Sequence, residues 1–181
     1  MDCPALIAAG LMPPGSGTEQ EPSWIKYPVE VEIGSVVTTV GSYAFYNCSG
    51  LTSVAIPDGV TSIGDWTFYN CSGLTSVAIP DGVTSIGNHA FYHCDSLTNM
   101  TIVNGIASIE NWTFAWCKKL TSVTIPDSVT SIGDYVFSYC SGLMSVTFSG
   151  KDKATVQGMS GYSWGLPSGC VLHCTDGDIT I

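Results

Sequence analysis

Ile63-Gly-Asp-Trp-Thr-Phe68-Tyr-Asn-Cys71-Ser-Gly-Leu74-Thr-Ser-Val77 decides the fold, because close copies of this stretch return every 23 residues. Three columns of identical residues mark the period. They are Phe45, Phe68, Phe91, Phe114 and Phe137; Cys48, Cys71, Cys94, Cys117 and Cys140; Leu51, Leu74, Leu97, Leu120 and Leu143. A period of 20 to 29 residues with spaced Leu, Ile and Val is typical of leucine-rich repeats, whose coils share one continuous core. The sequence therefore predicts a leucine-rich repeat solenoid.

Each repeat divides into recognisable segments. Leu51 to Ile56 alternates apolar and small residues and predicts the sheet strand. Pro57-Asp58-Gly59 predicts a turn, Val60 to Ile63 a short extended piece, and the segment after Gly64 about one helical turn. Such an array is mainly β with short helical turns, and we expect it to be right-handed and curved.

The pattern also predicts three parts of the chain. Residues 1–28 are rich in Pro, Gly and Ser and are expected to form an arm or linker. Residues 29–150 hold about five repeats after an N-terminal half-repeat, in which Glu30 and Glu32 suit an open edge. Residues 151–181 are expected to cap the last coil, because an uncovered terminal repeat exposes its core.

Charge and hydropathy exclude several classes of partner. The chain has 181 residues with a net charge of −10, which opposes nucleic acids and anionic membrane surfaces. No apolar run is long enough to span a bilayer, so we expect no membrane insertion. Residues 1–12 lack the basic start of a signal peptide, so the export route is left open. The sequence does not determine the oligomeric state either. The five column cysteines are expected to be reduced and buried, with Cys170 and Cys174 open in their redox state.

The repeat resembles the BspA-like leucine-rich repeat family, most closely at Ala44-Phe45-Tyr46-Asn47-Cys48 and Ala90-Phe91-Tyr92-His93-Cys94. The resemblance covers residues 37–148, and the tail His173-Cys-Thr-Asp-Gly177 is similar to the end of many such arrays. It implies a secreted or cell-surface adhesion protein of host-associated bacteria or some protozoa, without catalytic residues or cofactors. Val103-Asn104 departs from the usual Pro-Asp and predicts a locally different junction between the third and fourth repeats.

The candidate binding surface is a stripe of aromatic residues. If Phe45 and Cys48 point inward, the neighbouring positions of every repeat point outward, Ala115 and Ser138 among them. Aromatic and His side chains fill most of these positions, and such rings are enriched at recognition surfaces. The predicted ligand-binding residues are Tyr43, Trp66, Tyr69, His89, Tyr92, Trp112, Trp116, Tyr135 and Tyr139. The competing interpretation is that rings of successive coils only stack on one another.

Weaker candidates have simpler explanations. The strand face, such as Asn99 and Thr101, is flat and uncharged and offers no anchor residue, so it ranks second. Asp columns could bridge calcium but are explained by turn chemistry. His89 and His93 could share a metal, yet no third ligand is evident, so no metal site is predicted. Gly161-Tyr-Ser-Trp-Gly165 matches a hydrolase string without the strand and helix that it needs.

The sequence therefore predicts a non-catalytic, adhesin-like binding module that recognises a host protein or glycan. The alternative is a structural or assembly component, a decoration or spacer of a particle or cell surface, docked through its N-terminal arm. No metal motif, phosphate loop or credible triad supports an enzyme.

Overall fold

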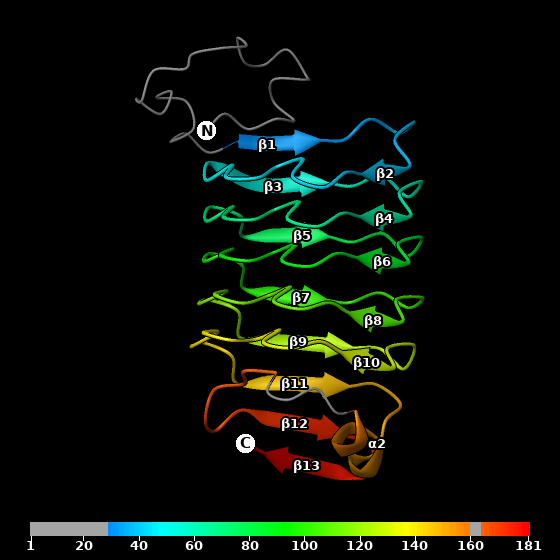
Figure 1. The fold of residues 1–181 in the computed structure, drawn as a ribbon, viewed down its shortest axis with the longest axis vertical. Helices are drawn as coiled ribbons and strands as arrows, with labels where there is room; N and C mark the ends of the chain where they lie inside the picture. The colour runs from blue at the N-terminus through cyan, green and yellow to red at the C-terminus, as the bar shows by residue number, and fades with distance from the viewer. Residues whose placement is uncertain (1–28, 160–163) are drawn as a thin grey trace.

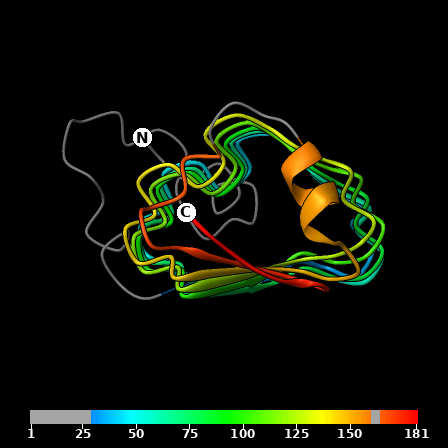
Figure 2. The same ribbon diagram turned by 90° about the horizontal axis from the view of Figure 1, so that it is seen from below.

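The computed structural model describes residues 29–159 and 164–181. Its coils lie one below another along a single axis (Figure 1), and each traces nearly the same outline when viewed along that axis (Figure 2). The molecule is a mainly β, leucine-rich repeat solenoid of about six turns with little helix, as predicted.

Two sets of parallel strands run down the solenoid. The longer set consists of β1 (Val29–Glu32), β3 (Leu51–Ala55), β5 (Ser76–Ala78), β7 (Asn99–Thr101), β9 (Ser122–Ile125) and β11 (Ser145–Phe148). The shorter set consists of β2 (Thr39–Val40), β4 (Ser62–Ile63), β6 (Ser85–Ile86), β8 (Ser108–Ile109) and β10 (Ser131–Ile132). Paired residues of successive repeats stand 23 positions apart, as Val54 and Val77 do. The sequence period is therefore the register of the sheets.

At the C-terminal end, three elements follow the last repeat. Strand β12 (Val171–Cys174) adds to β11 in parallel, and β13 (Gly177–Thr180) pairs antiparallel with β12. The short helix α2 (Lys153–Gly158) begins after Asp152, whose side chain accepts a hydrogen bond from the Thr155 N–H. Lys151 is 6% exposed, and its Nζ donates to the Asp127 backbone oxygen at 2.8 Å. These contacts hold the end segment against the preceding coil.

The core is built from the repeated columns of the sequence. The five Phe rings are buried and stack in one line with centroids 5.2 to 6.0 Å apart. The column cysteines are buried beside them, and each thiol from the second coil onward donates to a backbone oxygen of the preceding coil, as Cys94 Sγ does to Phe68 at 3.3 Å. Burial raises the pKa of the Cys94 and Cys117 thiols well above their usual range. These groups are therefore hydrogen-bonded core thiols.

The cysteine prediction is wrong for the first coil. Cys48 is buried like the others but is disulfide-bonded, whereas Cys71, Cys94, Cys117 and Cys140 are free. The column is otherwise uniform in burial, so repeat position alone could not separate Cys48 from the rest. Cys170 and Cys174 are also free, and burial raises the pKa of both thiols.

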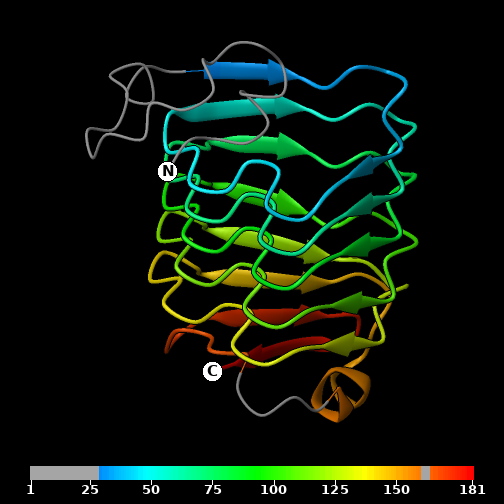
Figure 3. The ribbon, with the colours of Figure 1, turned by 45° about the horizontal axis from the view of Figure 1, so that its top comes forward.

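The segment expected to be a helical turn is not helical. Its N–H groups alternate: Phe45 N–H donates to the next coil, at Thr67 O, whereas Cys48 N–H closes a local turn onto Phe45 O. The same path recurs on the side away from the long strands (Figure 3). A helix would direct its N–H groups along its own axis. Here half of them join neighbouring coils, so the turn segments form a third hydrogen-bonded ladder.

Both strand ladders are interrupted between the second and third full repeats. β5 does not pair with β7, and β6 does not pair with β8, within the described residues. In the third repeat, Val103-Asn104-Gly105 replaces the Pro-Asp-Gly turn of the preceding repeats, and Gly105 has φ 102°. The irregularity predicted for the junction of the third and fourth repeats is present in this turn, whereas the break in strand pairing lies one repeat earlier, and β7 pairs with β9. The turn ladder continues across the interruption, for instance through Phe68 N–H to Ala90 O at 2.8 Å.

Candidate functional site

The aromatic stripe lies on the turn ladder, where the backbone has an unusual conformation. Among residues 29–159 and 164–181, ten non-glycine residues have φ between 55° and 64°, and all of them stand at two positions of the repeat. These are Tyr43, Trp66, His89, Trp112 and Tyr135 at the first position, and Asn47, Asn70, His93, Trp116 and Tyr139 at the second. A positive φ at the third residue of a turn is the mark of a type II turn, which favours Gly or Asn. Bulky rings at such positions are outliers.

Rings at the first position form a continuous stack through five coils. Trp66 lies on His89 with centroids 4.1 Å apart, and Trp112 lies on Tyr135 at 4.6 Å. The Tyr43–Trp66 and His89–Trp112 separations are 6.1 Å. All four pairs are close to parallel. We call this stack the first ring column.

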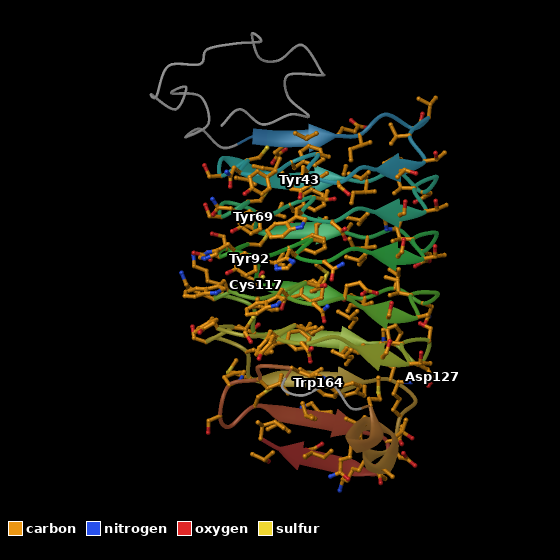
Figure 4. The ribbon with its side chains drawn as sticks, in the orientation of Figure 1. Tyr43, Tyr69, Tyr92, Cys117, Asp127 and Trp164 are labelled. Atoms are coloured by element: carbon orange, nitrogen blue, oxygen red, sulfur yellow. The ribbon has the colours of Figure 1, made fainter. Side chains whose placement is uncertain are left out.

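Two shorter stacks run beside the first ring column. Tyr46, Tyr69 and Tyr92 stack at 4.9 Å, with Tyr69 and Tyr92 one above the other in Figure 4. His93, Trp116 and Tyr139 stack at 4.8 and 4.3 Å. Each of the nine predicted ligand-binding residues therefore belongs to a stack. The stacking of rings from successive coils, which the competing interpretation expects, is present. The nine residues remain candidates for ligand binding.

Exposure differs along the stripe. Tyr43, Tyr135 and Tyr139, which end their stacks, are 49%, 45% and 62% exposed. The rings between them are partly exposed. The outward placement expected for Ala115 and Ser138 is wrong, because both are buried. The position they share is occupied in earlier coils by Tyr, whose long side chain reaches the surface, whereas Gly165 packs against Ser138.

His89 is the titratable group at the centre of the first ring column. Burial lowers the pKa of His89 below its ordinary 6.5, and the Asp65 carboxylate partly opposes this change. Its Nδ1 is buried without a hydrogen-bond partner in the described part of the chain. Burial, followed by the charges of Tyr46 and Tyr92, raises the pKa of Tyr69. Both shifts favour the uncharged forms of His89 and Tyr69 at neutral pH.

A small charged cluster beside the stripe was not predicted. Lys118 Nζ lies 3.0 Å from Asp95 Oδ2 and 5.2 Å from the centre of the Trp116 ring. His93 Nδ1 lies 3.1 Å from the other oxygen of Asp95. The sequence held a signal for this pair, because Asp95 and Lys118 occupy the same repeat position 23 residues apart. An exposed pair of this kind contributes little to stability.

The column that contains Asp65, Asn88, Asn111 and Asp134 has a structural role. Asp65 Oδ1 accepts from Asn88 N–H and Asn111 Oδ1 from Asp134 N–H, both at 2.7 Å, so this column links coils. Asp127 lies at the opposite edge of the coils from the tyrosine stack (Figure 4). No group of three potential metal ligands occurs within residues 29–159 and 164–181. In the hydrolase string, Gly161 to Ser163 lie outside the described residues.

A family model for the BspA type leucine rich repeat region matches residues 29–158 in six copies. The chain belongs to the BspA-type leucine-rich repeat family. The resemblance predicted from the sequence is therefore confirmed. This family typically comprises non-catalytic binding proteins, and its repeats imply protein binding.

Solved structures of bacterial leucine-rich repeat proteins are similar to this BspA-type chain. A protein of T. pallidum is 33% identical with a TM-score of 0.64, and one from Eubacterium ventriosum is 27% identical with a TM-score of 0.59. A leucine-rich cell surface protein of Faecalibacterium prausnitzii is 34% identical with a TM-score of 0.53. The matches cover 66%, 67% and 67% of this chain and 58%, 32% and 39% of those structures, respectively.

The comparisons place this BspA-type chain among modules of the binding type that resemble bacterial cell-surface proteins. The chain spans less than two thirds of each of those structures. No curated protein sequence matches it. Among the described residues, no helix has the length and apolar character needed to cross a bilayer.

Proposed function

We propose that this chain is a non-catalytic, adhesin-like module, displayed outside the cell, that recognises a host protein through the aromatic stripe. The observation that carries the proposal is the backbone conformation beneath the rings. Six of the ten residues with left-handed φ are Tyr or Trp. Strained residues of this kind cluster at functional sites.

The energies argue against stacking as the sole reason for these rings. A left-handed backbone costs roughly 1–2 kcal/mol for a residue other than glycine, whereas a favourable ring pair contributes about 0.5–1.5 kcal/mol. Asn47 and Asn70 fill the second position in the first two coils and are linked by a 3.0 Å hydrogen bond. Asn is a residue type that this conformation favours. Trp116 and Tyr139 at the same position are therefore costly for folding, which supports a role in recognition.

The way the rings stack favours protein over glycan as the ligand class. A pyranose commonly packs its C–H groups on the face of an aromatic ring. Within the stacks, the faces of rings such as Tyr69 are covered by the rings of adjacent coils. These inner rings present their edges and phenol hydroxyls to the solvent. Such groups contact protein side chains and backbone well, and large rigid aromatic groups are common anchors of protein interfaces.

The test is binding of the purified chain to immobilised extracellular-matrix proteins and to a glycan array. The stripe variant is Trp116→Asn with Tyr139→Asn, because Asn keeps the backbone conformation seen at Asn47 and Asn70. The matched control changes the strand face by Asn99→Ser with Thr101→Ala, the residues that Ser76 and Ala78 provide at the same positions one repeat earlier. Both variants are checked for unchanged secondary structure and melting temperature.

We expect the wild type and the strand-face variant to bind a matrix protein, and the stripe variant to lose this binding at least tenfold. Loss in the strand-face variant alone would move the site to the sheet. Binding to glycans alone would overturn the ligand class. A wild type that binds neither would contradict the adhesin role.

A further inference from the structure

The third repeat carries a dipeptide that occurs once in the chain. Asn104-Gly105 stands where the neighbouring repeats have Asp58-Gly59 and Asp81-Gly82, and no other Asn in the sequence is followed by Gly. Both residues are exposed, and they follow Val103 where the other turns begin with Pro. An exposed Asn-Gly pair is prone to deamidation, since glycine has no side chain to shield its own backbone nitrogen, which follows the Asn.

The turn that holds this pair is less restrained than its counterparts. In the other three turns the Pro carbonyl accepts from the N–H three residues later, at 3.0 Å for Pro57 and Pro80 and 3.2 Å for Pro126. Within residues 103–106 the structure contains no equivalent bond. A Cβ added at Gly105 would find only the Val83 backbone oxygen, at 3.9 Å. The space beside the Gly105 Cα is therefore open, and the Gly105 N–H donates to a side chain, Ser128 Oγ, in place of a turn carbonyl.

We propose that Asn104 is a site of spontaneous deamidation in the folded protein. The Gly105 backbone nitrogen attacks Cγ of Asn104, the new N–C bond closes a five-membered succinimide, and the side-chain nitrogen leaves as ammonia. Water then adds to either ring carbonyl and breaks one of its C–N bonds. One water is consumed and one ammonia is released. The products are aspartate, or isoaspartate with one more carbon in the main chain.

One hydrogen bond controls the reaction. Gly105 N–H donates to Ser128 Oγ at 3.2 Å, and Ser128 Oγ donates to Ile106 O at 2.9 Å. A nitrogen held as a hydrogen-bond donor is a poorer nucleophile, because attack requires loss of that proton. At the position of Ser128, earlier repeats have Gly59 and Gly82, which have no hydroxyl. The hydrogen bond that slows the reaction is therefore specific to the fourth repeat.

The products change the surface and the backbone at a defined place. Aspartate at 104 adds one negative charge and completes a column with Asp58, Asp81 and Asp127. Isoaspartate lengthens the main chain in the repeat where β5 and β7 are unpaired. We therefore expect the modification to loosen the middle of the array with time, without touching the aromatic stripe.

The experiment follows the intact chain in mildly alkaline buffer by peptide mass spectrometry, with enzymatic isoaspartate methylation as a second readout. Asn99-Met100 and Asn111-Trp112 are internal controls, since both asparagines are exposed. We expect Asn104 to convert ahead of both. The Ser128→Gly variant, which restores the glycine of the earlier repeats, should convert about 2- to 10-fold faster, the factor that corresponds to a hydrogen bond of about 0.5–1.5 kcal/mol.

The proposal fails if folded wild type and Ser128→Gly both keep Asn104 intact over a period in which the urea-unfolded chain converts it. That outcome would mean that the turn protects the pair. Equal rates in the folded variant and folded wild type would refute the role of Ser128.

Discussion

The ring of Tyr139 lies on the ring of Trp116, with centroids 4.3 Å apart, although both residues have a left-handed backbone. Two opposing contributions meet at this contact, because the stack is favourable and the backbone beneath it is not. At this pair, substitutions can therefore measure the free-energy cost of the backbone conformation separately from the gain from ring stacking.

Replacing Tyr139 by Asn should change the free energy of unfolding by less than about 1 kcal/mol, because the lost stacking is offset by an easier left-handed backbone. Tyr139→Val should be worse by roughly 1–2 kcal/mol, since a β-branched residue tolerates this conformation poorly. Urea unfolding of the two variants checks this. Equal stabilities would show that the backbone strain is negligible.

Replacing Cys94 by Ser should destabilise the array by about 1–3 kcal/mol, because a more polar hydroxyl enters a fully buried site beside the Phe ladder. Cys94→Ala is the companion variant, since it removes the bond to Phe68 O without adding a polar group. Thermal and urea unfolding measure both. A melting temperature of Cys94→Ser equal to that of the wild type would contradict the burial of this column.

Lys151 should stabilise the C-terminal end mainly through its hydrogen bond to the Asp127 backbone oxygen, and less through its ion pair with the Asp127 carboxylate. Lys151→Met removes the buried donor to the Asp127 backbone oxygen and should cost on the order of 1–3 kcal/mol. Asp127→Asn removes only the partly solvated charge and should cost less than about 1 kcal/mol. Denaturant midpoints of the two variants decide between these effects. A larger loss of stability in Asp127→Asn than in Lys151→Met would show that the ion pair contributes more than the hydrogen bond to the backbone.

The pH dependence of stability should contain a contribution from His89. Because burial lowers the pKa of His89 below 6.5, the unfolded chain binds more protons at acidic pH. This contribution to stability is therefore full above about pH 6.5 and is lost as pH falls through the folded pKa. His89→Asn, which suits the left-handed backbone, should lose less stability between neutral and mildly acidic pH. Parallel profiles would contradict this expectation.

Much of the fold could be predicted because each column of the sequence becomes a column of the structure. The register that pairs Val54 with Val77 is the 23-residue period itself. The sequence predicts a helix for the turn segment because residues at i, i+1 and i+4, such as Thr67, Phe68 and Cys71, face inward in both conformations. Spacing alone cannot show whether an N–H bonds within its own coil or to the next.

The candidate surface was predictable by position but not by conformation. Alternation placed Tyr43 and Trp66 at the surface, yet a left-handed backbone under rings contradicts local preference and leaves no mark in the sequence. Repeat position predicts an outward Ala115 because Tyr92 shares its position. Side-chain length, which repeat position ignores, decides whether that position reaches solvent.

The interruption between β5 and β7 gives the stacked coils one direction in which they can bend. Neither β5 and β7 nor β6 and β8 pair as strands, and Thr98 N–H reaches Thr75 O there only at 3.4 Å. On the turn side, shorter bonds from Trp66, Phe68 and Asn70 join the same two coils. Pulling on the chain at both ends should therefore open a wedge on the strand side and leave the aromatic side intact as its hinge. A module fixed at one end and held by a partner at the other would yield to flow or tension at this point, without releasing the stripe.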